Sequence, residues 1–400
     1  MRITSRLCFA IGLSLCVATT ASIVLFGHLG TVRTAFADGF FGPFLPLQVS
    51  TVPSNGDTTP YGLAFVPNGF PERADISTGT LLVSNFNSSA TPGAGLGTTI
   101  ITVNPKTGQT GQFFPPAGAS PPLPIGFTNA LTIARVGLVF AGSLPTSDGT
   151  FLTAMPGPLD VFDGNGNLLK QLSSNELVDG PWGMALNDRG NTAQLFVSNI
   201  FDTSGHFAGS ITRLDVLMSS SGITVLDKIT IADSYTSAAD MAGTVVGPAG
   251  LAYDSFNDIL YVAAEGDNAI YAVKGAGHFT SEHHGKGQVI FDDQTVLHGP
   301  LGLIFAPNGN LIIANADPAH FSPTPTDPSE IIEITRSGTF VRKFSIDPNP
   351  GAAFALLVMD KDRHFSEDHQ DFDHHYDLES EQFVYIDDFV SNCIIWKLAK

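Results

Sequence analysis

The chain has 400 residues, of which 43% are hydrophobic and only 14% charged, with 41 Gly, 26 Pro and a net charge of −19. This apolar content excludes a disordered chain, and abundant Gly and Pro argue against a helix bundle. Because the chain is strongly acidic, it repels the phosphates of nucleic acids and of anionic membranes. We therefore expect no nucleic-acid partner.

The N-terminal segment has the features of a secretory signal peptide. Two arginines precede an almost wholly apolar run over residues 7–29, and Ala35-Phe36-Ala37 follows as a small-x-small cleavage site. We therefore expect residues 1–37 to be removed and residues 38–400 to form one secreted, periplasmic or extracellular domain. An uncleaved membrane anchor is the alternative, because the apolar run approaches the length of a bilayer span. Cleavage would leave Cys393 without an intramolecular disulfide partner.

A short phrase recurs along the rest of the chain. It contains Pro, a variable residue, Gly and then alternating apolar residues, and its copies begin at Pro60, Pro181, Pro248 and Pro300. A turn and a second apolar run ending in a small or polar residue follow each copy. Repeats of this length, built from short strands, are typical of propeller blades.

Six blades of up to four strands can be laid out in chain order. They cover about residues 60–114, 128–172, 182–232, 249–291, 301–346 and 354–396, the second with a degenerate phrase. The sixth lacks one strand, whereas the strand-like residues 45–52 belong to no blade. Because open sheet edges are avoided, we predict that residues 45–52 pair beside residues 393–398 and close the ring.

The phrase resembles NHL-type repeats and the wider group of six-bladed, TolB-like propellers, over about residues 60–400. This resemblance implies an all-β, six-bladed propeller closed by the N-terminal strand. Such repeats specify the fold well and the function poorly.

The variable residue of each phrase is expected to line the central channel. Around the ring this set reads Tyr61, Asn129, Trp182, Ala249, Leu301 and Phe354. In six-bladed lactonases, which the pattern resembles, the corresponding place carries Asn and acidic residues that bind calcium, and only Asn129 fits. The aromatic members either pack within the channel or contact a ligand.

A second ring is predicted where the second strands end. Its members are Asn85, Ser143, Asn199, Glu265, Asn315 and Asp387. These side chains either bond backbone at the blade ends or converge on one channel mouth as ligand-binding groups. In the second case Glu265 and Asp387 can hold calcium through oxygen.

A stretch rich in His and acids interrupts the sixth blade over residues 364–377. Imidazole and carboxylate suit a transition metal, so the candidate ligands are His364, His369, His374 and His375. The spacing matches no defined site, and a solvated acidic loop is the alternative. His278, His283 and His284 form a weaker cluster in the fourth blade.

The sequence contains no Gly-x-Ser-x-Gly, no His-Glu-x-x-His and no phosphate-binding loop. The first hypothesis is therefore an exported, monomeric propeller that binds an unidentified protein or small molecule, with no cofactor firmly implied. The alternative is a propeller enzyme, such as a hydrolase, a lyase or a quinoprotein-like oxidoreductase, with its site at one mouth of the channel. A purely structural role in the cell envelope is third.

Overall fold

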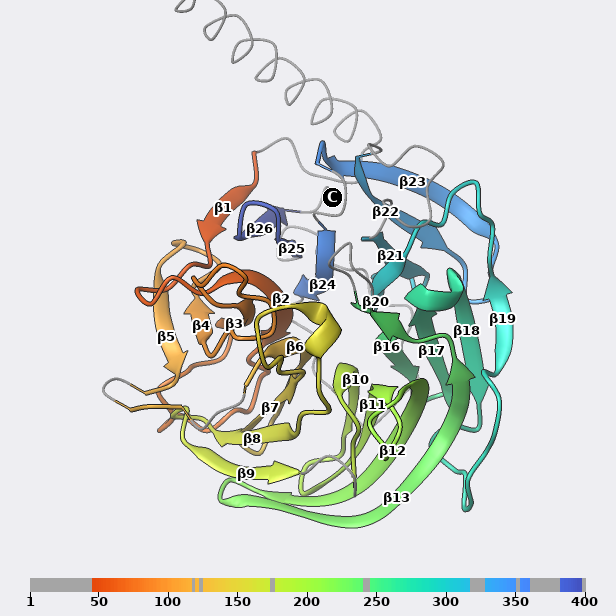
Figure 1. The fold of residues 1–400 in the computed structure, drawn as a ribbon, viewed down its shortest axis with the longest axis horizontal. Coiled ribbons are helices and arrows are strands. Elements are labelled where there is room, and N and C mark those ends of the chain that lie inside the picture. Colours follow the sequence, from red (N-terminus) through yellow and green to blue (C-terminus); the bar gives the residue numbers. More distant parts are fainter. Residues whose placement is uncertain are drawn as a thin grey trace, which may run out of the picture.

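Six four-stranded antiparallel sheets form a ring in the computed structural model (Figure 1), which makes the protein an all-β, six-bladed propeller. The structure describes residues 45–116, 119–121, 125–172, 177–239, 245–316, 328–349, 353–359 and 382–397. The signal region and the four histidines of the 364–377 stretch lie outside these residues. No helix among the described residues is long and apolar enough to cross a membrane.

The first three blades follow one another in the chain. Blade 1 comprises β2 (Thr58–Phe65), β3 (Leu81–Asn87), β4 (Ile100–Val103) and β5 (Thr110–Phe114). Blade 2 comprises β6 (Phe127–Ala134), β7 (Leu138–Ser143), β8 (Leu159–Asp163) and β9 (Leu168–Leu172), with the 3-10 helix η1 (Phe151–Thr153) between β7 and β8. Blade 3 comprises β10 (Pro181–Asp188), β11 (Thr192–Phe201), β12 (Phe207–Ser219) and β13 (Gly222–Tyr235).

Blade 4 comprises β16 (Pro248–Asp254), β17 (Ile259–Ala264), β18 (Ala269–Lys274) and β19 (Gln288–Phe291), with η2 (Glu265–Asp267) after β17. Blade 5 comprises β20 (Pro300–Phe305), β21 (Leu311–Asn315), β22 (Ser329–Ile334) and β23 (Phe340–Asp347). Blade 6 comprises β24 (Ala353–Met359), β25 (Gln382–Asp387), β26 (Asn392–Lys397) and β1 (Leu47–Ser50). A two-stranded sheet that the repeat did not predict, β14 (Ala238–Ala239) with β15 (Val245–Val246), connects blades 3 and 4.

The predicted closure of the ring is confirmed. β1 pairs antiparallel with β26, so that Val49 lies opposite Cys393. Both side chains are buried. Thr51 extends the junction, because its N–H and its hydroxyl each donate to the Ser391 carbonyl at 2.8 Å. Blade 6 is therefore built from both ends of the described chain.

The Gly of the recurring phrase permits the first strands of neighbouring blades to approach one another. A Cβ atom on Gly183 would meet the carbonyl of Ala249 in the next blade, and Gly250 and Gly302 stand in the same relation to Leu301 and Phe354. Small residues at these positions are thus required by backbone contact near the axis. The phrase reports the scaffold rather than a ligand.

The pairing register defines two faces of the ring. In blade 1, Pro60 at the start of the first strand pairs with Asn85 at the end of the second. Connections from second to third strands, and from one blade to the next, therefore lie on one face, which we call the mouth face. Connections from first to second and from third to fourth strands lie on the opposite face.

The core lies between neighbouring sheets. Between blades 2 and 3, for example, Phe140 and Leu159 pack with Leu195 and Leu214, and all four side chains are fully buried. Successive side chains of a strand point to opposite faces of the sheet. Continuous apolar runs, such as those of β11 and β21, therefore supply both faces of a sheet with such contacts.

Candidate functional site at the channel mouth

Aromatic side chains fill the centre of the ring. Tyr61 stacks between Phe86 and Phe354, with ring centroids 4.8 Å and 4.6 Å away. Trp182 meets Tyr61 edge-on at 5.7 Å and Phe86 at 6.1 Å. The register of each first strand shifts at this point, as between Pro60 and Gly62, and such bulges redirect side chains. Three predicted channel residues thus pack against one another.

The remaining members of the predicted channel set differ in their surroundings. Ala249 and Leu301 join the same apolar cluster. Asn129 is half-buried within an irregular stretch of β6, where the register shifts between Phe127 and Leu131. Within the described residues no three His, Cys, Asp or Glu side chains gather as they would around a metal ion. Calcium takes six to eight oxygen ligands, so the described channel does not fit the calcium centre that the resemblance suggests.

One polar atom is left unsatisfied inside this cluster. Trp182 is only 2% exposed, and its indole Nε1 has no hydrogen-bond partner. A buried N–H without an acceptor is costly, and in native proteins such donors are rare. The indole N–H is therefore available to an acceptor on a bound molecule.

The asparagines of the predicted strand-end ring hold the connections between blades. Asn199 Oδ1 accepts the N–H of Asp179 at 2.9 Å, and Asn315 Oδ1 accepts the N–H of His298 at 2.9 Å. Asn85 Nδ2 donates to the Thr51 carbonyl at 3.1 Å. These bonds tie the end of a second strand to the segment that precedes the first strand.

Ser143, in the degenerate blade 2, occupies the same register position but bonds within its own blade. Its hydroxyl donates to Asp160 at 2.9 Å. Burial raises the pKa of Asp160 to about 6. Ser143 is buried and bonded to a protein group, as Asn199 and Asn315 are. The Oδ1 of Asn85, in contrast, is a buried acceptor without a hydrogen-bond partner. A part of these residues in ligand binding stays a prediction.

Glu265 does not occupy the position that the sequence suggests. In blade 4, Pro248 pairs with Ala264, just as Pro181 pairs with Asn199 in blade 3. Glu265 is therefore one residue beyond the strand-end ring, at the start of η2. The residues at this next position around the ring are Phe86, Leu144, Ile200, Glu265, Ala316 and Asp388. We call them the mouth ring.

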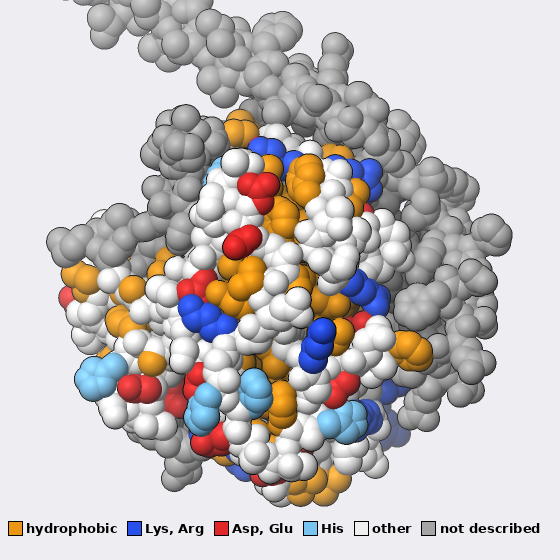
Figure 2. Space-filling view, turned by 90° about the vertical axis from the view of Figure 1, so that its right-hand side faces the viewer, with side chains coloured by type: hydrophobic (Ala, Val, Ile, Leu, Met, Phe, Trp, Pro, Cys, Tyr) orange, Lys and Arg blue, Asp and Glu red, His pale blue; other side chains and the backbone are white. Residues whose placement is uncertain are grey.

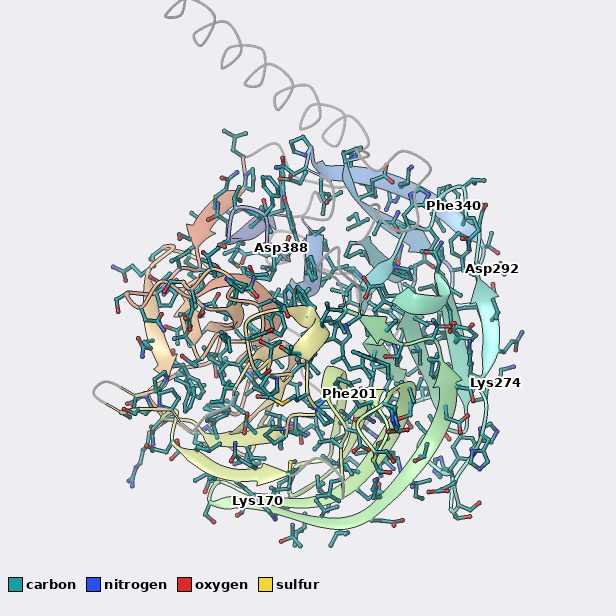
Figure 3. All side chains as sticks on the ribbon, in the orientation of Figure 1. Lys170, Phe201, Lys274, Asp292, Phe340 and Asp388 are labelled. Carbon is teal, nitrogen blue, oxygen red and sulfur yellow. The ribbon has the colours of Figure 1, made fainter. Side chains whose placement is uncertain are left out.

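The mouth ring has an apolar side and an acidic side. Phe86, Leu144, Ile200 and Ala316 all belong to the central apolar cluster, which shows that this position faces the channel. Glu265, in blade 4, is 3% exposed, and Asp388, in blade 6, is half-buried. Ala316 of blade 5 occupies the position between them in the ring. Figure 3 shows Asp388 toward the centre of the ring, whereas Lys170 and Lys274 lie at its periphery.

The acids of blade 6 perturb one another. Burial, followed by the neighbouring carboxylate of Asp347, raises the pKa of Asp387 to about 7. Burial and the charge of Asp387 hold the pKa of Asp388 well above its usual range. Burial, together with the charges of Asp347 and Asp387, also raises the pKa of Tyr385. The Tyr385 hydroxyl donates to the Ile346 carbonyl at 3.2 Å. Carboxyl groups that titrate near neutrality are suited to general acid–base chemistry.

A loop of blade 2 completes the mouth. η1 lies over the centre of the ring in Figure 1, and its Phe151 stacks on Phe86 with ring centroids 5.7 Å apart. Hydrogen bonds join this loop to blade 1, from Ala94 N–H to the Gly149 carbonyl at 3.0 Å and from Thr146 Oγ1 to the Ala94 carbonyl at 2.5 Å. The apolar side of the mouth is thus covered by an aromatic side chain.

Sequence reasoning missed Asp388, Asp347 and Phe151. Asp388 directly follows a predicted ring residue, so aligning the second strands on their pairing with the phrase would have revealed it. Asp347 ends an outer strand, and nothing in the repeat brings it beside blade 6.

The histidines of blade 4 are held by separate partners. His278 Nδ1 is 2.6 Å from Asp258, and His284 Nδ1 is 2.6 Å from Asp233, so each ring is held by a different carboxylate. The four histidines of residues 364–377 lie outside the described residues. The strand ends that flank them, Met359 and Gln382, pair on the opposite face from the mouth.

Comparisons with known proteins support the fold. No protein-family model and no curated protein matches the chain. Among solved structures, a gluconolactonase from Xanthomonas campestris aligns with a TM-score of 0.52 and 12% identity, over 91% of this chain and 92% of its own. A candidate gluconolactonase aligns with a TM-score of 0.50 and 13% identity, over 90% of this chain and 94% of its own. At this identity the likeness establishes a shared six-bladed propeller.

Proposed function

We propose that this protein is an exported propeller hydrolase that cleaves small esters or lactones at the mouth face. The observation that carries the proposal is Asp388, a mouth-ring carboxyl whose pKa is held well above its usual range. It lies two blades from Glu265 in the ring, with Ala316 of blade 5 at the position between them. The names of the two similar solved structures favour lactones among the esters. The NHL-like relationship and export suggested by the sequence are retained within this proposal.

The chemistry requires one proton carrier. Ionised Asp388 accepts a proton from water as the water oxygen attacks the ester carbonyl carbon. The C–O bond to the leaving oxygen then breaks, and protonated Asp388 returns the proton to that oxygen. The Trp182 N–H offers a donor to the negative charge that develops on the carbonyl oxygen. Asp387 acts as a positioning residue, because its charge helps to set the pKa of Asp388.

The test is hydrolysis of phenyl acetate and of five- and six-membered lactones, followed by proton release at constant pH. Asp388→Asn removes the proton carrier and should lower kcat by about 100-fold or more. Asp292→Asn is the matched control, because Asp292 is exposed and lies at the periphery of the ring (Figure 3). Unchanged kcat/KM in Asp388→Asn would remove the basis of the proposal.

Asp387→Asn separates a tuning role from a merely structural one. Loss of its charge should lower the pKa of Asp388, so the acid limb of the pH–rate profile should move to lower pH while KM changes little. An equal loss of rate at every pH would indicate structural damage instead.

The binding-module hypothesis keeps one specific observation in its favour. Phe389 and Val390, at the tip of the β25–β26 turn, are 66% and 49% exposed on the mouth face. Exposed apolar residues on a loop are typical of protein contacts. If no ester or lactone is cleaved, this second function would be favoured by a partner protein that binds the wild type but not the double variant Phe389→Ser, Val390→Ser.

A further inference from the structure

Four aromatic rings form a continuous stack that ends at the mouth face. The ring centroids of Phe354 and Tyr61 lie 4.6 Å apart, and those of Tyr61 and Phe86 lie 4.8 Å apart. Phe151 of η1 continues the stack beyond Phe86, at 5.7 Å. The planes of successive rings differ by 10°, 11° and 26°, so the step to Phe151 is the widest and the least parallel. We call these four rings the aromatic column.

Phe151 differs from the other members of the column in its position. The other three rings stand on strands of blades 6 and 1, whereas Phe151 comes from the mouth-face connection between β7 and β8. Phe86 is fully buried and Tyr61 is 6% exposed, but Phe151 is only partly buried. Among the described residues, its ring contact is with Phe86 alone. Phe151 therefore covers the face of Phe86 that Tyr61 leaves open, and it is the member of the column that can leave.

The backbone that carries Phe151 is held by its own loop. Asp148 accepts the N–H of Thr150 at 2.9 Å and the hydroxyl of Thr153 at 2.6 Å. An isolated β-bridge closes the base of the loop. The loop thus keeps its shape without the contact between the two rings. The Phe151 ring can therefore rotate about its side-chain bonds while η1 stays in place.

An unpaired donor lies beside the column. Trp182 meets Tyr61 and Phe86 edge-on, is 2% exposed, and has an indole Nε1 without a hydrogen-bond partner. A buried N–H of this kind is costly until an acceptor satisfies it. A ligand that stacks on Phe86 and carries an acceptor next to its ring would supply that partner.

We propose that Phe151 is a gate over an aromatic subsite: its ring swings away from Phe86, and a planar ring of the substrate takes its place. This inference rests on the proposed function and names the substrate class of the same site, an ester or lactone that carries a flat unsaturated ring. The rim of the molecule differs, because Figure 2 shows its apolar side chains among charged and histidine side chains. The column instead offers parallel ring faces, on which a planar ring stacks and a puckered saturated ring does not.

The experiment measures binding without turnover. The probes are benzamide and cyclohexanecarboxamide, which share the carbonyl acceptor and the ring size and differ in planarity. Each is titrated into the purified protein and followed by calorimetry and by tryptophan fluorescence. We expect benzamide to bind about three- to tenfold more tightly, the range that ring stacking supplies. The saturated ring is the more apolar of the two, so this preference reports stacking. Trp182→Phe should remove most of the fluorescence change, which assigns the signal to the column.

A variant of the gate gives the opposite sign from a variant of a binding wall. Phe151→Ala should raise the affinity for benzamide about two- to tenfold, because the open state no longer competes with the closed one. The affinity for cyclohexanecarboxamide should rise less. Leu152→Ala is the matched control, since Leu152 is the next residue of η1 and is 54% exposed, and it should change neither affinity.

The outcomes separate the subsite from the hydrolase. Equal affinities of the wild type for the two amides would overturn the aromatic subsite, whether or not Phe151→Ala folds. Weaker benzamide binding in Phe151→Ala would overturn the gate. Hydrolysis is compared on benzyl acetate and cyclohexylmethyl acetate, whose leaving groups are both primary alcohols. Selective binding of benzamide without hydrolysis of either ester would leave the subsite standing and remove the hydrolase, and hydrolysis of both esters with equal kcat/KM and equal amide affinities would do the reverse.

Discussion

Asp387→Asn provides a sharp test of the electrostatics at the mouth. Blades 1, 3 and 5 carry Asn85, Asn199 and Asn315 at the register position that Asp387 occupies in blade 6. Asn is therefore already compatible with this position in the scaffold. The variant replaces an acid that is costly to ionise with the neutral residue that its equivalents carry.

The magnitude follows from the pKa. Burial and Asp347 raise the pKa of Asp387 from 3.8 to about 7, so the native state holds a proton that the unfolded chain releases near pH 4. The resulting stabilisation is complete below about pH 4 and is lost as pH rises through 7. Two pH units between 5 and 7, at about 1.4 kcal/mol each, predict a fall of about 2–3 kcal/mol in the free energy of unfolding between pH 5 and pH 8.

Urea unfolding at a series of pH values, followed by tryptophan fluorescence, measures the effect. The variant and the wild type should be closest in stability below about pH 4, where Asp387 is protonated in both the native and the unfolded chain. Between pH 5 and pH 8 the stability of Asp387→Asn relative to the wild type should rise by about 2–3 kcal/mol, and its free energy of unfolding should change less with pH. Asp292→Asn should follow the wild type. Parallel pH dependences for wild type and Asp387→Asn would refute the assigned pKa and its cause.

Three further predictions concern the scaffold. Gly183→Ala places a Cβ against the Ala249 carbonyl and should lower the free energy of unfolding, measured with urea, by about 3 kcal/mol. In the control Gly190→Ala nothing lies near the new Cβ but φ is positive, so the loss should be only about 1 kcal/mol. Similar losses in the two variants would contradict the packing role of Gly183. Val49→Asp buries a charge opposite Cys393 and should lower the free energy of unfolding by about 3 kcal/mol or more. Amide hydrogen exchange should then rise first in β1 and β26. A uniform change in exchange would argue against closure of the ring through this pair. Burial raises the pKa of Cys393 to about 12, so iodoacetamide should label it, by mass spectrometry, only after unfolding.

The scaffold was predictable because its constraints recur in every blade. In four blades the first strand approaches the next so closely that Gly is required, and this requirement appears in the sequence as the repeated phrase. Counting strands showed that the sixth blade lacked one strand and that residues 45–52 belonged to no blade. The prediction that this segment completes the sixth blade is confirmed by the pairing of Val49 with Cys393.

The site was less predictable because its register depends on single-residue offsets. Glu265 and Asp387 appear equivalent in sequence, since each is polar and follows an apolar run. η2 begins directly after β17, so the strand ends at Ala264 and Glu265 falls at the channel-facing position. Asp388 resembles an ordinary turn residue, and the contact of Phe151 with Phe86 depends on how a long loop folds back.

The two adjacent ring positions respond to different constraints, which explains why Asn recurs in three of the six blades at the first and no residue recurs at the second. The strand-end position must hold the connection between blades, and an Asn amide does so in blades 3 and 5 through a backbone N–H. The next position faces the channel and is free to vary, from Phe86 to Ala316 to Asp388. Blade 6 alone has an acid at both. Any change in the ionisation of Asp387 therefore alters the stability of the closing blade and the pKa of Asp388 together, so stability and acid–base chemistry at the mouth should share one pH dependence.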